Sequence, residues 1–253
     1  MPQYAFGAGA LIGTPTQDAF GTAIANPTPI QFGVLQDVSV DMSFDVKELY
    51  GQNQFAVAVG RGKGKITGKA KFAQINGLIL NSLFFGQTLA TGTLTDVIDT
   101  TGSVIPGTPF QITPTVPGSG TWAVDLGVKN ASGQPMTRVI SGPTTGQYSV
   151  SAGVYTFATA DAGLTVFISF QYTATSTIAR KSTVQNVLMG YAPTFRCDLY
   201  SPYGGKALTI SLPNCIGTKL TFATKQDDFM IPEFDFSAFA DGSGNVMTYS
   251  TSE

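Results

Sequence analysis

The chain has 253 residues, with 14 basic and 16 acidic side chains and a formal net charge of −2. That length can bury roughly 70–75% of the unfolded surface, in one large domain or two smaller ones. Charged residues make up only 12% of the chain, against a usual share of roughly 25%, which does not suit a freely diffusing monomer and favours a subunit whose surface is covered by neighbours.

The first 33 residues are rich in glycine, proline and threonine. They predict an extended arm, with a little strand over 4–12 and turns at Pro15, Pro27 and Pro29. Such an arm cannot bury itself, so we expect it to fray or to lie on a neighbour. The N-terminal segment lacks the features of a secretory signal, and no window has the roughly 18 apolar residues that span a bilayer. These features predict a protein that is made in a cytoplasm, stays soluble or assembles there, and does not bind membranes.

Residues 37–72 alternate polar and apolar side chains across two strands. The first strand, over 34–47, has an acidic face with Asp37, Asp41 and Asp45 and an apolar face that runs from Val38 to Val46. The second strand, over 61–72, has a basic face opposite a face of small and apolar residues. Its basic residues are Arg61, Lys63, Lys65, Lys69 and Lys71. Because successive side chains of a strand point to opposite faces, the pattern predicts a sheet with one buried face and one charged face.

The connection over 48–60 is longer than the two to five residues of most hairpin loops. We expect it either to project from the sheet or to extend both strands beyond it. Its tip carries Phe55, Val57 and Val59. An exposed apolar tip of this kind indicates a contact site.

The best helix is predicted over 73–86. Ile75, Leu78, Ile79 and Leu83 recur there at helical spacing, and Gly86 can cap the end. A single short helix packed on a sheet is the expected arrangement.

The remaining chain reads as strands and turns. Residues 91–180 begin with four prolines and continue as short strands between turns, which favours a small β-sandwich or sheet inserted into a larger domain. Strands are then predicted over 194–200, 206–212, 219–224, 233–238 and 246–249. The predicted fold is therefore mainly β, a sandwich or barrel with one flanking α-helix, divided into 1–90, the insertion 91–180, and 181–253.

No constellation of residues indicates catalysis. The chain has no histidine, the commonest general base and transition-metal ligand. Ile66 follows the GRGKGK run at 60–65, where a phosphate-binding loop needs a hydroxyl, and the segment from Asp241 lacks the glycine and glutamate of a calcium loop. Cys197 and Cys215 are too few for a disulfide scaffold. They are interpreted as small buried side chains, with a bridge between neighbouring strands as the alternative. We predict no enzyme activity, no cofactor and no metal site.

The basic row leaves two interpretations open. It could contact nucleic-acid phosphates without reading sequence. Alternatively, the cations pair across strands with Asp37, Asp41 and Asp45, or with acids of a neighbouring subunit. Pairing is favoured here.

Three segments resemble the tail tube (major tail) proteins of long-tailed bacteriophages. The first is GVLQDVSVDMSFDVKELYGQNQFAVAVGRGKGKITGKAKFAQINGLILNSLFFG (33–86), similar to the family's strand, long loop, strand and helix. The second is GQYSVSAGVYTFATADAGLTVFISFQYT (146–173), similar to a β-rich segment of longer members. The third is NVLMGYAPTFRCDLYSPYGGKALTISLPNCIGTKLTFATKQDDFMIPEFDFSAFADGSGNV (186–246), similar to the C-terminal core strands.

The resemblance implies a virion subunit of the tail, assembled in the host bacterial cytoplasm. Six protomers would close a ring, and rings would stack into a tube that contacts other tail proteins. Double-stranded DNA would pass through the bore without specific binding. The loop over 48–60 would bridge to the next ring through Leu49, Tyr50, Gln52, Phe55, Val57 and Val59, and the arm would add contacts between subunits. The acidic and basic rows would be lumen charges or cross-strand pairs, and the insertion is expected outside the tube because it would obstruct a bore.

Three other functions remain as alternatives. A head or capsid decoration protein would form closed oligomers and no tubes. A carbohydrate-binding β-sandwich adhesin would need exposed aromatic platforms, and the chain has a single tryptophan, Trp122. A nucleic-acid-binding module would use the basic row over 61–71.

Overall fold

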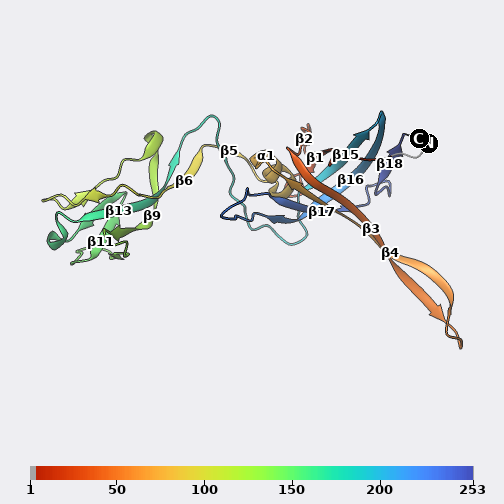
Figure 1. Ribbon diagram of the computed structural model, residues 1–253, viewed down its shortest axis with the longest axis horizontal. Coiled ribbons are helices and arrows are strands. Elements are labelled where there is room, and N and C mark those ends of the chain that lie inside the picture. The colour runs from red at the N-terminus through yellow and green to blue at the C-terminus, as the bar shows by residue number, and fades with distance from the viewer. Residues whose placement is uncertain (1–3, 253) are drawn as a thin grey trace. The chain divides into compact units, whose positions relative to one another are not determined.

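The computed structural model describes residues 4–252 (Figure 1). The protein is mainly β, with several sheets and one short helical segment, as the sequence predicted. It divides into two compact units. The first unit runs to Leu89 and resumes at Ser182, and the second comprises Ala90–Lys181. Within the described residues, no helix has the length and apolar character needed to cross a membrane.

The first unit is built on one antiparallel sheet of eight strands. Their order is β2–β1–β15–β16–β17–β4–β3, and β18 pairs with β16 beside β17. The bounds are β1 (Ala10–Gln17), β2 (Ile30–Gln31), β3 (Leu35–Tyr50), β4 (Ala56–Phe72), β15 (Thr194–Tyr203), β16 (Lys206–Thr221), β17 (Glu233–Phe239) and β18 (Thr248–Thr251). No described strand pairs with the outer side of β3, so β3 forms an edge of the sheet.

A short helical segment follows β4, inside the range predicted from the sequence. It consists of α1 (Gly77–Ile79) and η1 (Leu80–Phe85), a π-helical turn. The Asn76 side chain accepts a hydrogen bond from the backbone N–H of Leu78 at 2.9 Å, which caps the first turn. Gly86 ends the segment with a φ of 58°, the left-handed conformation in which glycine is favoured as a helix terminator.

The apolar face of this segment is narrower than predicted. Ile79 and Leu83 are buried in the core, whereas Ile75 and Leu78 are exposed. Ile75 lies before the first helical residue, and the wider i→i+5 bonding of a π-helix moves side chains away from their α-helical positions. The segment therefore packs on β1 and β16 through its second half.

The core of the first unit lies between the helical segment and one face of the sheet. Phe234 is fully buried, and the centroid of its ring lies within 6.0 Å of those of Phe32, Phe84, Phe195 and Phe236. Gly217 allows the helical segment to approach, because a Cβ atom there would lie 2.6 Å from Cδ2 of Phe84.

The predicted N-terminal arm is wrong for residues 10–32. β1 pairs with β15 along its length, and Leu11, Ile30 and Phe32 are buried in the core. Local composition predicted an arm because it carries no information about β15, the strand that pairs with β1, which lies near the other end of the chain. Residues 4–7 are exposed, and the ring of Phe6 lies 5.9 Å from that of Tyr203.

The strands predicted over 206–212 and 219–224 form one continuous strand, β16. Pro213 lies where β16 changes neighbours: β18 pairs with residues 208–211 and β17 with residues from Asn214 onward. The missing N–H of proline is tolerated because Pro213 has no register partner on β15, β17 or β18.

The two cysteines lie on adjacent strands, Cys197 on β15 and Cys215 on β16. Both are buried and free. Burial raises the pKa of the Cys197 thiol well above its usual value and raises the pKa of Cys215 to about 12. Both thiols therefore stay protonated at neutral pH and act as small apolar side chains.

The second unit contains two four-stranded sheets and a two-stranded pairing where the chain enters and leaves. One sheet contains β6 (Thr93–Val97), β7 (Ser103–Val104), β9 (Thr121–Asn130) and β13 (Thr165–Ala174). The other contains β8 (Gln111–Ile112), β10 (Thr137–Arg138), β11 (Gln147–Ser151) and β12 (Val154–Phe157). β5 (Ala90–Thr91) pairs with β14 (Arg180–Lys181), and η2 (Pro117–Ser119) and η3 (Thr159–Asp161) are single 3₁₀ turns. Side chains from both sheets share one core.

A buried carboxylate organises polar groups inside this second core. The side chain of Asp125 accepts hydrogen bonds from the hydroxyls of Tyr148 at 2.8 Å and Tyr155 at 3.1 Å. Burial, followed by the contact with Asp125, raises the pKa of the Tyr148 hydroxyl. The indole N–H of Trp122 donates to the Tyr155 hydroxyl at 3.3 Å. Trp122 is thus held against the core by its polar atom and does not form an exposed platform.

Candidate assembly surface

The β3–β4 hairpin runs beyond the rest of its sheet. β17 pairs with β4 only as far as Ile66, whereas β3 and β4 remain paired to Tyr50 and Ala56. Figure 1 shows the two strands continuing together as a ribbon. Residues 41–50 of β3 are all exposed. We call residues 41–65 the projecting ribbon.

The predicted long loop over 48–60 is mostly strand. Of the two arrangements expected from the sequence, the structure shows the one in which both strands extend beyond the sheet. The turn itself spans residues 51–55, between the ends of β3 and β4. It is therefore a short hairpin connection of ordinary length.

Large apolar side chains lie exposed along the projecting ribbon. Phe55 at the turn is 83% exposed, and Leu49, Tyr50, Val57 and Val59 are between 58% and 66% exposed. Gln52, the polar member of the predicted contact set, is also exposed. Closer to the sheet, Met42, Phe44 and Val46 continue the exposed apolar row. A contiguous apolar surface of this kind is typical of an interaction site.

Arg61 does not share a face with the lysines of β4, contrary to the sequence prediction. The register shifts between the Phe44–Gly64 and Val46–Arg61 pairs, which leaves one extra residue on β4. A β-bulge of this kind reverses the alternation of faces. The guanidinium carbon of Arg61 consequently lies 4.7 Å from the centroid of the Phe44 ring, a cation–π contact on the apolar face.

The lysines in the part of β4 that pairs with β17 form ion pairs with an acid that was not among their predicted partners. Glu233 on β17 contacts Lys69 at 2.9 Å and Lys71 at 3.2 Å. These contacts lower the pKa of Glu233, and the hydrogen bond to Glu233 raises the pKa of Lys69. β17 becomes the neighbour of β4 only in the folded sheet, so spacing along the chain gave no signal for the pair.

The cross-strand pairing predicted with the acidic row of β3 is present in the strand register for Asp37 but not as an ion pair, and pairing with acids of a neighbouring subunit stays a prediction. Asp37 lies opposite Lys71 in the strand register, and Asp41 lies opposite Thr67. Among residues 4–252, none of Asp37, Asp41 and Asp45 forms an ion pair with the five basic residues of β4. Glu233 reaches Lys69 and Lys71 from the opposite side and takes the place expected for these aspartates.

The face of the sheet opposite to the core carries a balanced set of charges. Arg196 and Asp198 of β15 form an ion pair there at 2.8 Å, and Lys219 of β16 lies opposite Asp235. By strand alternation, and counting β3 and β4 only up to the bulge beyond Phe44 and Gly64, the basic members of this face are Lys65, Lys69, Lys71, Lys219 and Arg196, and the acidic members are Asp37, Asp41, Asp198, Glu233 and Asp235. We call this five-to-five set the open charged face.

The acidic turn near the C-terminus is structural. Asp241 accepts hydrogen bonds from the backbone N–H groups of Ser243 at 2.9 Å and Asn245 at 2.8 Å. These bonds, led by the one from Asn245, lower the pKa of Asp241. They close the tight turn that the sequence analysis preferred over a calcium loop.

Comparison with known proteins adds no assignment. No protein-family model matches this chain, and no curated protein matches its sequence.

Proposed function

We propose that this chain is a structural subunit of the tail tube of a long-tailed bacteriophage. Six copies close a ring, rings stack into a hollow tube, and assembly needs no cofactor. The observation that carries the proposal is the projecting ribbon, which leaves the sheet with apolar side chains exposed along it. Exposed apolar side chains are unfavourable on a monomer in water, whereas they are typical of a contact between subunits.

The lateral contact is assigned to the outer side of β3. This sixteen-residue strand has no described partner on that side, and unpaired strand edges readily pair with another chain. Pairing β3 with the opposite sheet edge of a neighbour continues the sheet from subunit to subunit. Closing six sheets in this way produces a barrel, which has no free edge.

The open charged face is assigned to the bore. The other face of the sheet packs against the helical segment, so only the charged face is available to line a channel. A wall with an excess of cations would hold DNA by its phosphates. The balanced charges of the open charged face favour passage of DNA without binding, and the ion pairs of Lys69 and Lys71 disfavour the alternative of a nucleic-acid-binding module.

Removing Glu233 is expected to create DNA binding. The Glu233→Gln change frees Lys69 and Lys71 from their shared carboxylate and gives the open charged face a net positive charge. The variant should bind a short duplex with a slope of log affinity against log salt of roughly −2, because two lysines become available to phosphates. Fluorescence anisotropy of a labelled duplex, with protein below its assembly concentration, measures this.

The matched control removes one negative charge elsewhere. Asp228 lies in the loop before β17, where it pairs with Lys225, so Asp228→Asn changes the net charge equally without altering the open charged face. It should bind DNA as weakly as the unmodified chain. Strong binding by the unmodified chain would instead favour the nucleic-acid-binding alternative.

Electron microscopy of the purified chain tests the proposal as a whole. We expect hollow tubes of uniform width in negative stain, because the ribbon and the edge of β3 together provide axial and lateral contacts. Closed rings or shells that do not elongate would favour the decoration-protein alternative. Monomers at high protein concentration would contradict assembly altogether.

A further inference from the structure

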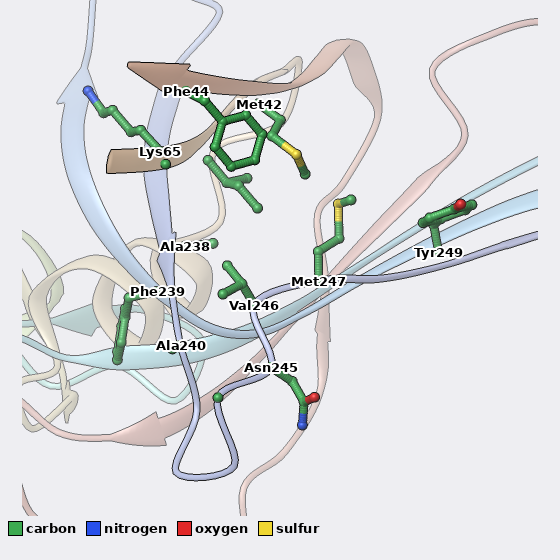
Figure 2. A pocket seen from close by; sticks show the side chains of 13 residues that line it. Met42, Phe44, Lys65, Ala238, Phe239, Ala240, Asn245, Val246, Met247 and Tyr249 are labelled. Carbon is green, nitrogen blue, oxygen red and sulfur yellow. The ribbon is translucent and has the colours of Figure 1, made fainter. Parts of the chain in front are cut away.

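A mainly apolar groove of about 750 Å³, whose lining also includes Lys65 and Asn245, lies where the projecting ribbon leaves the sheet. Figure 2 shows Met42 and Phe44 of the ribbon on one side and Val246 and Met247 on the other, with Phe239 and Tyr249 at its ends. The groove exists because β17 ends at Phe239 and β18 begins at Thr248, so β16 exchanges one partner strand for another and leaves a gap in the sheet. Its volume is within the range of roughly 300–1,000 Å³ that binding pockets occupy.

The turn of the same hairpin has the chemistry that this groove requires. Residues 51–60 (GQNQFAVAVG) contain no charged side chain, so placing them in an apolar site strands no charge. Phe55, Val57 and Val59 are at least 65% exposed. The chain therefore carries an apolar groove and an apolar projection that are both left open.

The turn cannot enter the groove of its own chain. Phe44 forms part of the groove, and β3 rises about 20 Å from Phe44 to Tyr50 at roughly 3.3 Å per residue. The two strands stay paired over that distance, so the turn is held away from the groove beside its base. A contact between the two requires a second molecule.

We propose that the groove accepts the hairpin turn, residues 51–59, of a second copy of this chain. The inference rests on the proposed function and names the acceptor for its axial contact. The two surfaces differ from each other, so the contact is head-to-tail and does not close on itself. Because the groove lies at the base of the ribbon and the turn lies at its end, each docked copy presents a fresh turn to the next. Repetition of this contact produces a filament.

Cross-linking tests the contact directly. A full-length chain with Phe55→Cys and Tyr249→Cys has one thiol at the turn and one beside the groove, while Cys197 and Cys215 stay buried. A short bis-maleimide should convert it into a covalent ladder that grows by single chains, with at least tenfold more multimer than either single substitution. The pair Phe55→Cys with Phe222→Cys, whose second site is exposed but outside the groove, should form no ladder.

A mixing experiment tests the direction of the contact. Phe55→Asp places a charge on the turn and leaves the groove unchanged. Phe239→Asp places a charge in the groove and leaves the turn unchanged. Each variant alone should fail to form tubes. In an equal mixture one contact remains, so assemblies should grow to two stacked units and stop, as sedimentation velocity would show. A mixture that stays at the size of the separate variants overturns the inference. Should Phe239→Asp not fold, the cross-linking result alone decides.

The outcomes separate this inference from the proposed function. Tubes whose Phe55 and Tyr249 positions do not cross-link overturn the groove contact and leave the tube proposal standing. Cross-linked multimers without hollow tubes support the groove contact and overturn the tube. Monomers without cross-links overturn both.

Discussion

Deleting residues 49–59 is expected to abolish tube formation while leaving the chain folded. The deleted side chains are exposed apart from the half-buried Ala56, and none of them belongs to the core cluster, so the core of the first unit loses no contact. The cut leaves Lys47, Glu48 and Gly60 as a three-residue loop that closes the Val46–Arg61 pair, and glycine suits the left-handed position of such a loop. Circular dichroism should show an unchanged thermal transition, and negative-stain images should contain no tubes.

A length-matched variant separates the effect of the apolar residues from that of the ribbon's reach. Replacing residues 49–59 with a glycine–serine segment of the same length keeps the connection but removes Leu49, Tyr50 and Phe55. It should also fail to polymerise. Phe229→Asp is the control for a single exposed phenylalanine, since Phe229 is 88% exposed and lies outside the ribbon. Normal tubes from the deletion variant would show that the ribbon has no part in axial contact.

Replacing Phe234 with alanine is expected to have the largest effect on stability. The Phe234 ring contacts four other phenylalanine rings at full burial, and cavities left by such truncations cost about 3–5 kcal/mol. In urea this corresponds to a midpoint lowered by roughly 2 M for a typical dependence on denaturant. Far-UV circular dichroism during urea unfolding measures the shift.

The same experiment tests whether the two units unfold separately. Trp122 is the only tryptophan and belongs to the core of the second unit, so its fluorescence follows that unit alone. Phe234→Ala should shift the circular-dichroism transition of the first unit and leave the fluorescence transition in place. Phe229→Ala, which truncates an exposed ring, should move neither. A joint shift of both signals in Phe234→Ala would show that the units unfold together.

The balance of charge on the open charged face would give a physical basis for the proposed passage of DNA without binding. Surface charges act over about 8 Å at physiological ionic strength. Lys69 and Lys71 lie directly opposite acidic residues of β17, and Lys71 also lies opposite Asp37 of β3, so a phosphate passing this part of the face would meet little net field. The face can therefore be strongly hydrated and still have little affinity for DNA.

Some elements follow from the sequence because their determinants are local. The alternation over residues 37–47 and 65–72 identifies two strands and assigns the buried face through Ile66, Ala70 and Phe72. The end of the helical segment is predictable from Gly86, because glycine readily adopts the left-handed conformation that ends a helix. The exposure of Phe55, Val57 and Val59 also follows, since an apolar turn at the end of a hairpin has no neighbouring element to cover it.

Other features are decided only by the tertiary structure, because they depend on strands that are distant in sequence. β1 becomes part of the core through pairing with β15, and Glu233 reaches Lys69 and Lys71 only when β17 lies beside β4. The bulge that moves Arg61 to the apolar face inserts one residue without a clear sequence signal. Periodicity thus determines which residues form strands and which face is apolar. The order of the strands depends on the free energy of the whole sheet. That order decides which charged side chains form ion pairs and where the groove lies.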